Sequence, residues 1–339
     1  MTRFRIVLFT LLAAFVALCF SLLVVGSVDI PLKNVLSIVS GEMSSNEAWN
    51  FIVLESRVPL IATSALAGAA LAVCGLLLQT LFGNPLADPS ILGVSTGSSL
   101  GVAIVMLLSG GSFGFAAYGY FATLSGALVG ALAVMAVLLA FSSVVKSSSM
   151  LLIIGVLISY LASSAISLMN FFATQESVHT YVIWGMGNFT SVTLNQLPVF
   201  SAVIAIGLVC AVLMIKPLNA LLLGDRYAAN LGVNLKLMRN GLLIVAGLLT
   251  AVVTAFCGPI SFVGLVVPHI SRLILRTTDH SRLLPVTMLS GAVLAMVCML
   301  VSVLPSNNGL IPVNAITPVI GVPVIIYIIL NRRRIFYFN

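Results

Sequence analysis

Long apolar runs alternate with short polar connections along this chain, and the runs define its architecture. A membrane-spanning helix needs about 20 mostly apolar residues, and ten runs qualify as candidates. They cover residues 6–26, 58–82, 91–109, 115–141, 150–173, 197–215, 241–257, 259–275, 284–304 and 316–331. The apolar stretch 178–189, which contains Trp184, Gly185 and Gly187, is too short to cross. We interpret it as a half-helix or re-entrant segment, which a membrane tolerates where protein or a water-filled cavity covers the backbone.

The first run has two readings. Arg3 and Arg5 precede it and Gly26-Ser27 resembles a cleavage site, as in a secretory signal peptide. Its apolar core is about 20 residues long, whereas the core of a signal peptide has roughly 7–15. We therefore predict a retained first span.

Composition agrees with an all-α polytopic membrane protein. Of 339 residues, 60% are hydrophobic and 7% are charged, whereas a soluble domain carries roughly 25% charged residues. A soluble core cannot hide this much apolar surface, so a soluble enzyme, a disordered chain and a nucleic-acid-binding protein are excluded. The five cysteines lie in apolar runs without a C-x-x-C pair, and we interpret them as small buried hydrophobic residues.

Charge placement predicts how the chain is oriented. With ten crossings and a cytoplasmic N-terminus, thirteen basic and three acidic residues lie inside, against two basic and five acidic residues outside. The two basic residues outside are Lys33 and Arg57, and those inside include Lys146 and Arg332 to Arg334. Positive charge concentrates on the cytoplasmic side of membrane proteins, so we expect both termini to be cytoplasmic. The basic balance is therefore a topology signal.

Small residues recur at helical spacing in three of the predicted spans. The sets are Ser64, Gly68 and Ala72; Gly93, Gly97 and Gly101; and Gly126 and Gly130. Such spacing lets helix backbones approach closely in lipid. Ser-Gly-Ala also occurs at 125–127 and at 290–292, in spans that cross in opposite directions. This fits an inverted repeat that pairs spans 2–5 with spans 7–10, although so short a match can also arise by chance.

The fifth span carries a polar stripe on one helical face. Its members are Ser159, Ser163, Ser167, Asn170 and Thr174, at spacings of four, four, three and four. These groups could line a transport pathway. Equally, each hydroxyl could bond a carbonyl one turn earlier or join two helices. The sequence does not decide between the two readings.

The longest predicted cytoplasmic connection, 216–240, is amphipathic, and Gly224 and Gly232 are placed to end short helices within it. A plain connection would be shorter and more polar, so we expect this loop to dock against a cytoplasmic partner. The alternative is a loop that lies on the lipid headgroups.

Two further segments draw attention by their proline and glycine content. The connection Gly83 to Pro89 contains Asn84, Pro85 and Asp88, and we expect a rigid turn in which Asp88 caps the next helix. Pro268, His269 and Arg272 follow one another near the inner end of the eighth span. A lone histidine is more often packed or hydrogen-bonded than a ligand. Pro268 should kink the helix, and Arg272 can extend to the inner surface.

Motifs of ATP binding and of metal-dependent catalysis are absent from the sequence. It contains no G-x-x-x-x-G-K-[ST] phosphate loop, no H-E-x-x-H motif and no cluster of metal-ligand residues. If ATP drives this protein, another chain must bind it. Every acidic residue lies in a connection or near a span end. Ion-coupled carriers commonly place an ionisable residue inside the membrane, which argues against a proton- or sodium-driven carrier.

Several long motifs, in order, resemble the permease subunit of type II ABC importers for iron–siderophores, haem and cobalamin, the FecCD-type family. They are R-V-P at 57–59, the segment 68–97 from G-A-A-L-A to V-S-T-G, L-G-D-R-Y-A-A-N-L-G at 223–232, G-P-I-S-F-V-G-L-V-V-P-H-I-S-R at 258–272, D-H-S-R-L-L-P at 279–285 and P-V-I-G-V-P at 318–323. The likeness covers nearly the whole chain. Asn84, Pro85, Asp88, Pro89, Gly93, Gly97, Pro268, His269 and Arg272 all fall within these motifs.

The resemblance implies one transmembrane permease domain over 1–339, in a bacterial cytoplasmic (inner) membrane, working as a homodimer with the pathway along its two-fold axis. Two ATPase subunits would bind ATP and magnesium below, an extracytoplasmic binding protein would deliver the ligand above, and this chain would hold no cofactor or metal. Helix five would line the pathway. The loop at 216–240 would couple to the ATPase through Leu223, Gly224, Asp225, Arg226, Tyr227, Ala228, Ala229, Leu231 and Gly232.

One departure concerns the binding protein. Relatives often carry R-x-P-R at the start of the second span and an arginine after the ninth, which pair with glutamates on that partner. Here Arg57 is kept for docking, the second position is Leu60, and 303–315 contains no arginine. We expect docking by salt bridges to be weaker or differently placed.

The sequence therefore predicts an ATP-driven importer of a metal chelate, with ferric siderophore preferred and cobalamin or haem as alternatives. A secondary carrier working alone is a rival of another class, and it would transport without ATP. A membrane receptor without transport is a third, which a glycine-striped bundle of ten spans does not favour.

Overall fold

The computed structural model describes residues 2–26, 28–108, 116–145, 147–304 and 309–330. Lys146 and Arg332 to Arg334, which contribute to the predicted inside charge, are outside the described residues. Within the described ranges the chain is helical and forms no strand. The predicted all-α class is confirmed.

A helix occupies each of the ten predicted runs. These helices are α1 (Thr2–Val24), α4 (Val58–Phe82), α5 (Val94–Ala103) continued by η2 (Ile104–Leu108), α6 (Ala116–Val144), α7 (Ser148–Phe172), α9 (Leu197–Leu213), α12 (Leu235–Cys257), α13 (Val263–Leu275), α14 (His280–Val303) and α15 (Val313–Leu330). Shorter elements connect them: α2 (Leu32–Val39), α3 (Glu47–Phe51), η1 (Ile52–Arg57), α8 (Gln175–Gly185), η3 (Phe189–Ser191), α10 (Ile215–Leu221) and α11 (Asp225–Asn230). The predicted half-helix is α8.

Helix length separates these runs into two groups. Six described helices are long and apolar enough to cross a membrane, and α9 with α10 forms a seventh candidate that bends by 53°. The apolar helices Val94–Leu107, Val263–Leu275 and Val313–Tyr327 are shorter. In the first two, glycine- and proline-rich turns occupy residues that the apolar pattern had assigned to the span.

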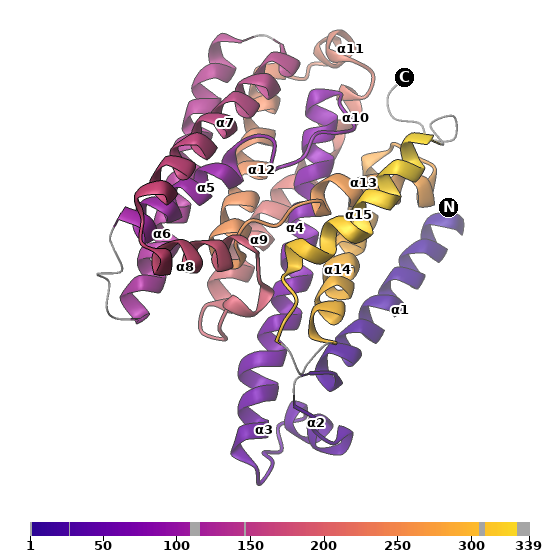
Figure 1. The fold of residues 1–339 in the computed structure, drawn as a ribbon. Coiled ribbons are helices and arrows are strands. Elements are labelled where there is room, and N and C mark those ends of the chain that lie inside the picture. Colours follow the sequence, from indigo (N-terminus) through magenta and orange to yellow (C-terminus); the bar gives the residue numbers. More distant parts are fainter. Residues whose placement is uncertain (1, 27, 109–115, 146, 305–308, 331–339) are drawn as a thin grey trace.

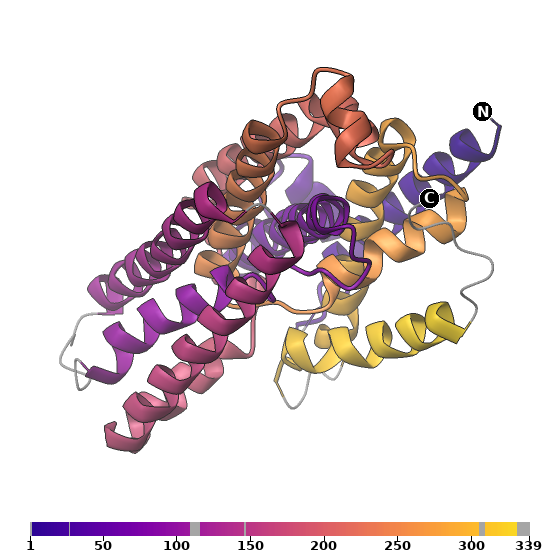
Figure 2. The same cartoon turned by 90° about the horizontal axis from the view of Figure 1, so that it is seen from above.

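Helix α4 lies at the centre of the bundle, surrounded by α14, α12, α13 and α9 (Figures 1 and 2). Small residues make this possible. A Cβ on Gly75 would overlap the carbonyl oxygen of Gly264, and a Cβ on Gly68 would overlap that of Gly291. The small residues predicted along α5 likewise allow two helix backbones to approach closely, because Gly97 and Gly101 pack against Gly130 and Gly126 of α6. Close backbone approach increases dispersion contacts in lipid, where no hydrophobic effect drives helices together.

Helix contacts also follow the predicted inverted repeat. If α4–α7 correspond to α12–α15, the packing of α4 on α14 has its counterpart in the packing of α12 on α6. The contacts of α5 with α7 and of α13 with α15 form a second such pair. The two Ser-Gly-Ala motifs are not equivalent in packing, however. Gly126 contacts Gly101 on α5, whereas Gly291 contacts Gly68 on α4.

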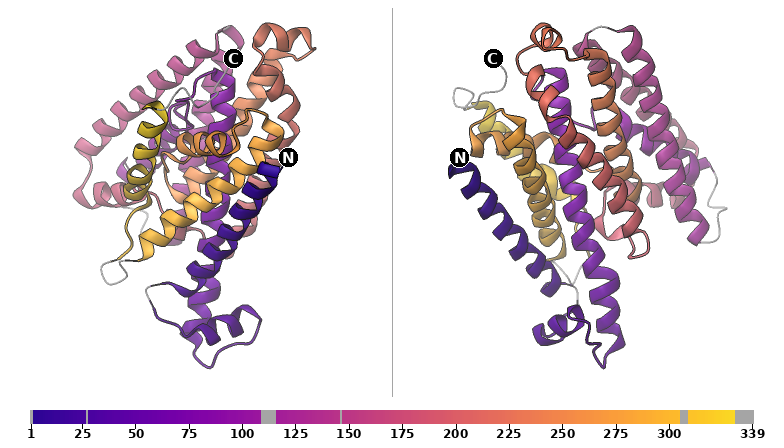
Figure 3. Two further views of the ribbon diagram at one scale, coloured as in Figure 1. Left: turned by 90° about the vertical axis from the view of Figure 1, so that its right-hand side faces the viewer. Right: turned by 180° about the vertical axis from the view of Figure 1, so that it is seen from behind.

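Residues 29–57 form a small projection at the end of the molecule opposite α10 and α11 (Figures 1 and 3). Elements α2, α3 and η1 enclose a separate apolar cluster of Ile30, Val35, Ile38 and Val53. From this end α1 runs back along α14 to the other end of the bundle. There the Nε atom of Arg3 donates to the carbonyl oxygen of Ile274 at 2.7 Å. We refer to the projecting end as the outer end, and to the opposite end as the loop end.

Candidate functional site

The loop end carries the segment predicted to meet a partner. The range 216–240 contains most of α10, all of α11 and the first turns of α12, which begins at Leu235. Gly224 and Gly232 flank α11 with φ angles of 94° and 86°. L side chains rarely adopt this left-handed region, so the prediction that these glycines end short helices is confirmed.

Helix α11 and the residues on either side of it present an apolar row to their surroundings. Leu223, Tyr227 and Leu231 recur every fourth residue and are 59%, 67% and 65% exposed. Asp225, Arg226, Ala229 and Gly232 are exposed beside them, while Ala228 is fully buried on the opposite side. Large apolar side chains at such exposure indicate a surface that another molecule covers. The predicted coupling residues are thus exposed, except for Ala228, which is buried.

The polar stripe of α7 divides into bonded and open groups. Ser159 Oγ donates to the carbonyl oxygen of Gly155 at 2.9 Å, and Ser167 Oγ donates to that of Ser163 at 3.0 Å. Thr174 caps α8 by accepting from the backbone nitrogen of Ser177. The two serine bonds match the interpretation in which each hydroxyl bonds a carbonyl one turn earlier in the helix. Ser163 and Ser167 are nevertheless exposed, so their oxygen atoms can still accept hydrogen bonds.

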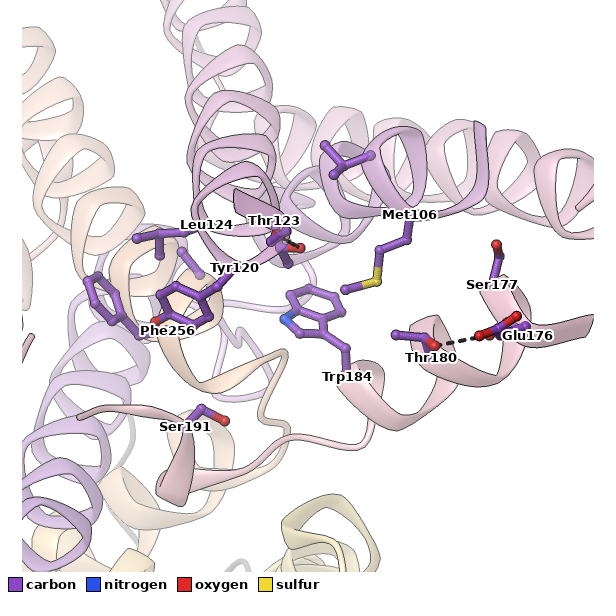
Figure 4. Close-up of a pocket in the computed structure, with 13 residues that line it drawn as sticks. Met106, Tyr120, Thr123, Leu124, Glu176, Ser177, Thr180, Trp184, Ser191 and Phe256 are labelled. Atoms are coloured by element: carbon purple, nitrogen blue, oxygen red, sulfur yellow. Dashed lines mark hydrogen bonds between the residues drawn. The ribbon is translucent and has the colours of Figure 1, made fainter. Parts of the chain in front are cut away.

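Helix α8 closes one side of a cavity of about 540 Å³ (Figure 4). The indole of Trp184 projects between Tyr120 of α6 and Met106 of η2, and Phe256 of α12 forms the far wall. Tyr120 donates to Oε1 of Gln196 at 3.1 Å. The lining is predominantly apolar, with Glu176 and Thr180 at one end. The cavity lies behind α8, on its side toward α6.

Arg57 has a different environment from the one expected of a docking residue. It is 5% exposed, and its Nη1 and Nη2 atoms lie 2.6 Å from the carbonyl oxygens of Leu23 and Val28. The guanidinium therefore caps the C-terminal end of α1, where carbonyls lack intrahelical donors. Leu60, at the second expected position, is also buried. Docking by Arg57 stays a prediction that this geometry does not favour.

The prediction that Asp88 caps α5 is wrong. Helix α5 begins at Val94 with Gly93 at its N-cap and no side-chain cap. The Asp88 carboxylate instead accepts from the backbone and hydroxyl of Ser90. It also accepts from the backbone of Leu265, in the first turn of α13. Five residues separate Asp88 from Val94, which places the carboxylate away from the first turn of α5.

Residues of the eighth span are buried rather than solvated. His269 is 2% exposed and its Nε2 atom lies 2.7 Å from the carbonyl oxygen of Pro85, as the packed reading predicts. Arg272 does not extend to the surface, because it is 4% exposed and donates to Oε1 of Gln79 at 2.5 Å. Helix α13 continues through Pro268. These groups join α13 to α4 and to the Asn84–Pro89 turn.

Three amides with structural roles were not identified from the sequence. Gln79 binds both Arg272 and the carbonyl of Leu265. Asn314 donates to the carbonyl oxygens of Gly185 and Pro259, so it joins the end of α8 to the start of α13. Asn219 connects α10 to α14. Their signal in the sequence is a single amide within or beside an apolar run, and it does not reveal the partner.

Comparison with known proteins gives a consistent picture. The profile of the FecCD transport family matches residues 11–331. The vitamin B12 import system permease protein BtuC of Citrobacter koseri is 35% identical over 283 residues, which cover 83% of this chain and 84% of that protein. The protein of the same name from Salmonella typhi is 36% identical over 282 residues, with the same coverage. A solved inward-facing conformation of a metal-chelate type ABC transporter has a TM-score of 0.83 and 29% identity, covering 97% of this chain and 99% of that one.

Proposed function

Because the chain belongs to the FecCD transport family, we propose that it is the membrane-spanning permease subunit of an ATP-driven importer. The observation that carries this proposal is the segment around α11, a short helix between two glycines with positive φ, where Leu223, Tyr227 and Leu231 are exposed at the loop end. The vitamin B12 permeases among its relatives are components of import systems. Hydrolysis of ATP belongs to a separate chain, since this sequence has no phosphate-binding loop.

The mechanism that fits this arrangement is alternating access. Two ATPase subunits would bind the exposed row of α11 at the loop end of a homodimer, and their closure would displace that helix. The buried Ala228 side of α11 would pass the displacement to the bundle. Helix α7 would then change the opening of a pathway between the two copies, lined by Ser163, Ser167 and Asn170.

The cargo that suits this pathway is a metal chelate. The hydroxyl and amide groups of α7 carry no charge, which suits a bulky ligand whose metal is already neutralised by its own donors. We propose a ferric siderophore as the specific cargo. The names of the relatives favour a second candidate, cobalamin, which is also a metal chelate.

A binding protein that delivers this cargo would meet the outer end. The exposed charges described on the projection are Asp29, Lys33, Glu42, Glu47 and Glu55, whereas Arg57 is buried. We propose that this partner docks through shape and apolar contact, with basic groups opposite the acidic ones. Exposed ion pairs contribute only about 0–1 kcal/mol each.

The experiment that tests the function is purification of the tagged, detergent-solubilised protein followed by an ATPase assay. We expect an ATPase subunit to co-purify, and its activity to rise when a binding protein loaded with ferric siderophore is added. Stimulation by a cobalamin- or haem-loaded partner alone would retain the importer and change the cargo. Transport in liposomes without any ATPase would contradict the proposal.

A pair of variants makes this test specific to α11. Leu231→Asp places a charge in the exposed row and should abolish co-purification of the ATPase. Leu36→Asp is the matched control, because Leu36 is 52% exposed but lies on α2 at the outer end. Loss of the ATPase from both variants would show that the charge acts through general damage to the protein.

A further inference from the structure

A single side chain of α10 joins the loop end to the bundle by several hydrogen bonds. Asn219 donates from Nδ2 to Oδ1 of Asp279 at 2.8 Å. Its Oδ1 atom lies 2.8 Å from the backbone nitrogen and 2.9 Å from Nδ1 of His280. Asp279 is the N-cap of α14 and His280 is its first residue. One amide thus connects α10 to the beginning of α14.

The orientation of this amide determines which nitrogen of His280 carries a proton. The carboxylate of Asp279 can only accept, so Nδ2 of Asn219 faces it and Oδ1 faces His280. Oδ1 accepts, which places the proton of the neutral ring on Nδ1. Nε2 is then an acceptor that lies 2.9 Å from Oγ1 of Thr80 in the last turn of α4, and it shares the single hydroxyl proton of Thr80 with the carbonyl oxygen of Leu76, which is also 2.9 Å away. His280 is 1% exposed, so water does not compete for these bonds.

The same turn of α4 also contacts α13. Gln79, next to Thr80, donates to the carbonyl oxygen of Leu265 at 3.2 Å and accepts from Arg272. Gln79 is fully buried, and Thr80 is 6% exposed. The end of α4 is therefore a junction that binds α10 and α14 through His280 and α13 through Gln79.

Alternative connections between the loop and the bundle are less rigid. A Cβ on Gly224 or Gly232 would meet no atom within 4 Å, so neither glycine is packed against the bundle. Helix α10 meets α9 at a bend of 53°. Helix α11 packs against α10 and to a lesser extent against α12, and Ala228 is its buried residue. A displacement of α11 can reach α10 directly, and the side chain of Asn219 hydrogen-bonds α10 to α14.

We propose that Asn219, His280 and Thr80 form the link through which movement of the coupling loop reaches α4 and α14. His280 is a positioning residue in this link, since it acts through its two neighbours and touches no cargo. The inference rests on the coupling role proposed above for α11. It predicts that breaking the link separates ATP hydrolysis from transport while the protein remains folded.

The first test compares two asparagine substitutions in proteoliposomes that contain the ATPase and the binding protein. Asn219→Ala should lower the cargo transported per ATP hydrolysed by about fivefold or more, a typical coupling change. Asn240→Ala is the matched control, because Asn240 is partly exposed and accepts a 2.7 Å hydrogen bond from Ser142 at the same end, on α12 rather than α10. Thermal unfolding of both variants is measured in parallel.

The second test replaces the hydrogen bonds by a covalent bond. Asn219→Cys with His280→Cys should be uncoupled when reduced and, because a disulfide restores the connection of α10 to α14 but not the contact with Thr80, should regain part of the coupling when oxidised. The wild type under the same oxidant controls for the five native cysteines. Restoration on oxidation and loss on reduction would support a mechanical link.

Three results distinguish a failure of the proposed function from a failure of the proposed link. A wild type that shows no ATP-dependent transport overturns the proposed function itself. A coupled wild type with an equally coupled Asn219→Ala variant overturns only the link. Lower thermal stability with unchanged transport per ATP shows that Asn219 is merely structural, and this also overturns the link.

Discussion

Helices α4 and α7 are the same length, 25 residues each, and equally hydropathic, yet their surroundings are opposite. Of the most apolar stretch of the span Glu47–Phe82, which contains α4, 78% is buried, whereas for α7 the share is 17%. The difference lies in side-chain size. Helix α4 meets its neighbours through Gly68 and Gly75, while α7 exposes Leu161, Phe171 and other large residues. In a membrane protein, apolar character shows that a helix can be in the bilayer, and small residues show where it is packed.

The largest effect should follow from adding one methyl group to the packed helix. In Gly75→Ala the new Cβ would overlap the Gly264 carbonyl oxygen. We expect α4 and α13 to separate at a cost of about 3 kcal/mol or more. Thermal unfolding and gel filtration in detergent measure this loss. Gly185→Ala in α8, where a Cβ meets no atom within 4 Å, should be neutral or slightly stabilising. A Gly75→Ala protein as stable as the wild type would contradict the packing contrast.

The second effect concerns a glycine needed for backbone conformation alone. Gly232 has a φ angle of 86° and its N–H donates to the Ala229 carbonyl oxygen at 3.0 Å. Proline fixes φ near −65° and has no N–H. We expect Gly232→Pro to insert and fold but to hydrolyse ATP with transport reduced about tenfold. Gly41→Pro is the control, since Gly41 has a φ angle of 97° in an equally open position at the outer end. Wild-type coupling in Gly232→Pro would refute the role assigned to the loop.

The third effect distinguishes the faces of α7. Ser163 and Leu161 are both exposed, but they lie on opposite sides of the helix, flanking the buried Ala162. If the serine face lines an aqueous pathway, Ser163→Cys and Ser167→Cys should react with a charged, membrane-impermeant thiol reagent. Leu161→Cys should remain unlabelled in lipid. The wild type gives the background of the native cysteines. Equal labelling at 161 and 163 would remove the support for a pathway along the polar stripe.

The smallest effect is a pH dependence at the loop end. Burial raises the pKa of Asp279, but hydrogen bonds from Ser281 and Asn219 and the nearby Arg282 outweigh it, and the net pKa is below the ordinary value. A depressed pKa stabilises the folded state above the ordinary carboxyl pKa, and this contribution is lost as the pH falls through the folded value. Asp279→Asn should therefore be less stable than the wild type at pH 7. The difference in melting temperature should vanish in acid, and a difference that persists there would point to another cause.

Much of the fold could be predicted from the sequence because its signals are local. Apolar runs located the helices, and the glycine spacing of α5 located its contact with α6. The conformations of Gly224 and Gly232 were predictable for the same reason, since a position with a positive φ angle favours glycine at that position itself.

The misjudged groups depend on residues far away in the chain. Asp88 is acceptor to Leu265, and Arg57 is donor to carbonyls at the end of α1. Asn219 binds residues 60 and 61 positions away. An isolated polar residue beside an apolar run shows that a partner is needed. It does not show which partner, because that depends on how the helices pack.

The position of α1 has a consequence for biosynthesis. This helix is made before the other described helices, yet its main contact is with α14, and Arg3 binds a carbonyl 271 residues later. At about 5–20 residues per second, the ribosome needs roughly 15–55 seconds to synthesise the intervening chain. During that interval the first helix must remain in the bilayer without its final neighbour. Its surface is almost wholly apolar, with charge confined to Arg3 and Arg5 at one end, so the helix is stable in the lipid before α14 is present.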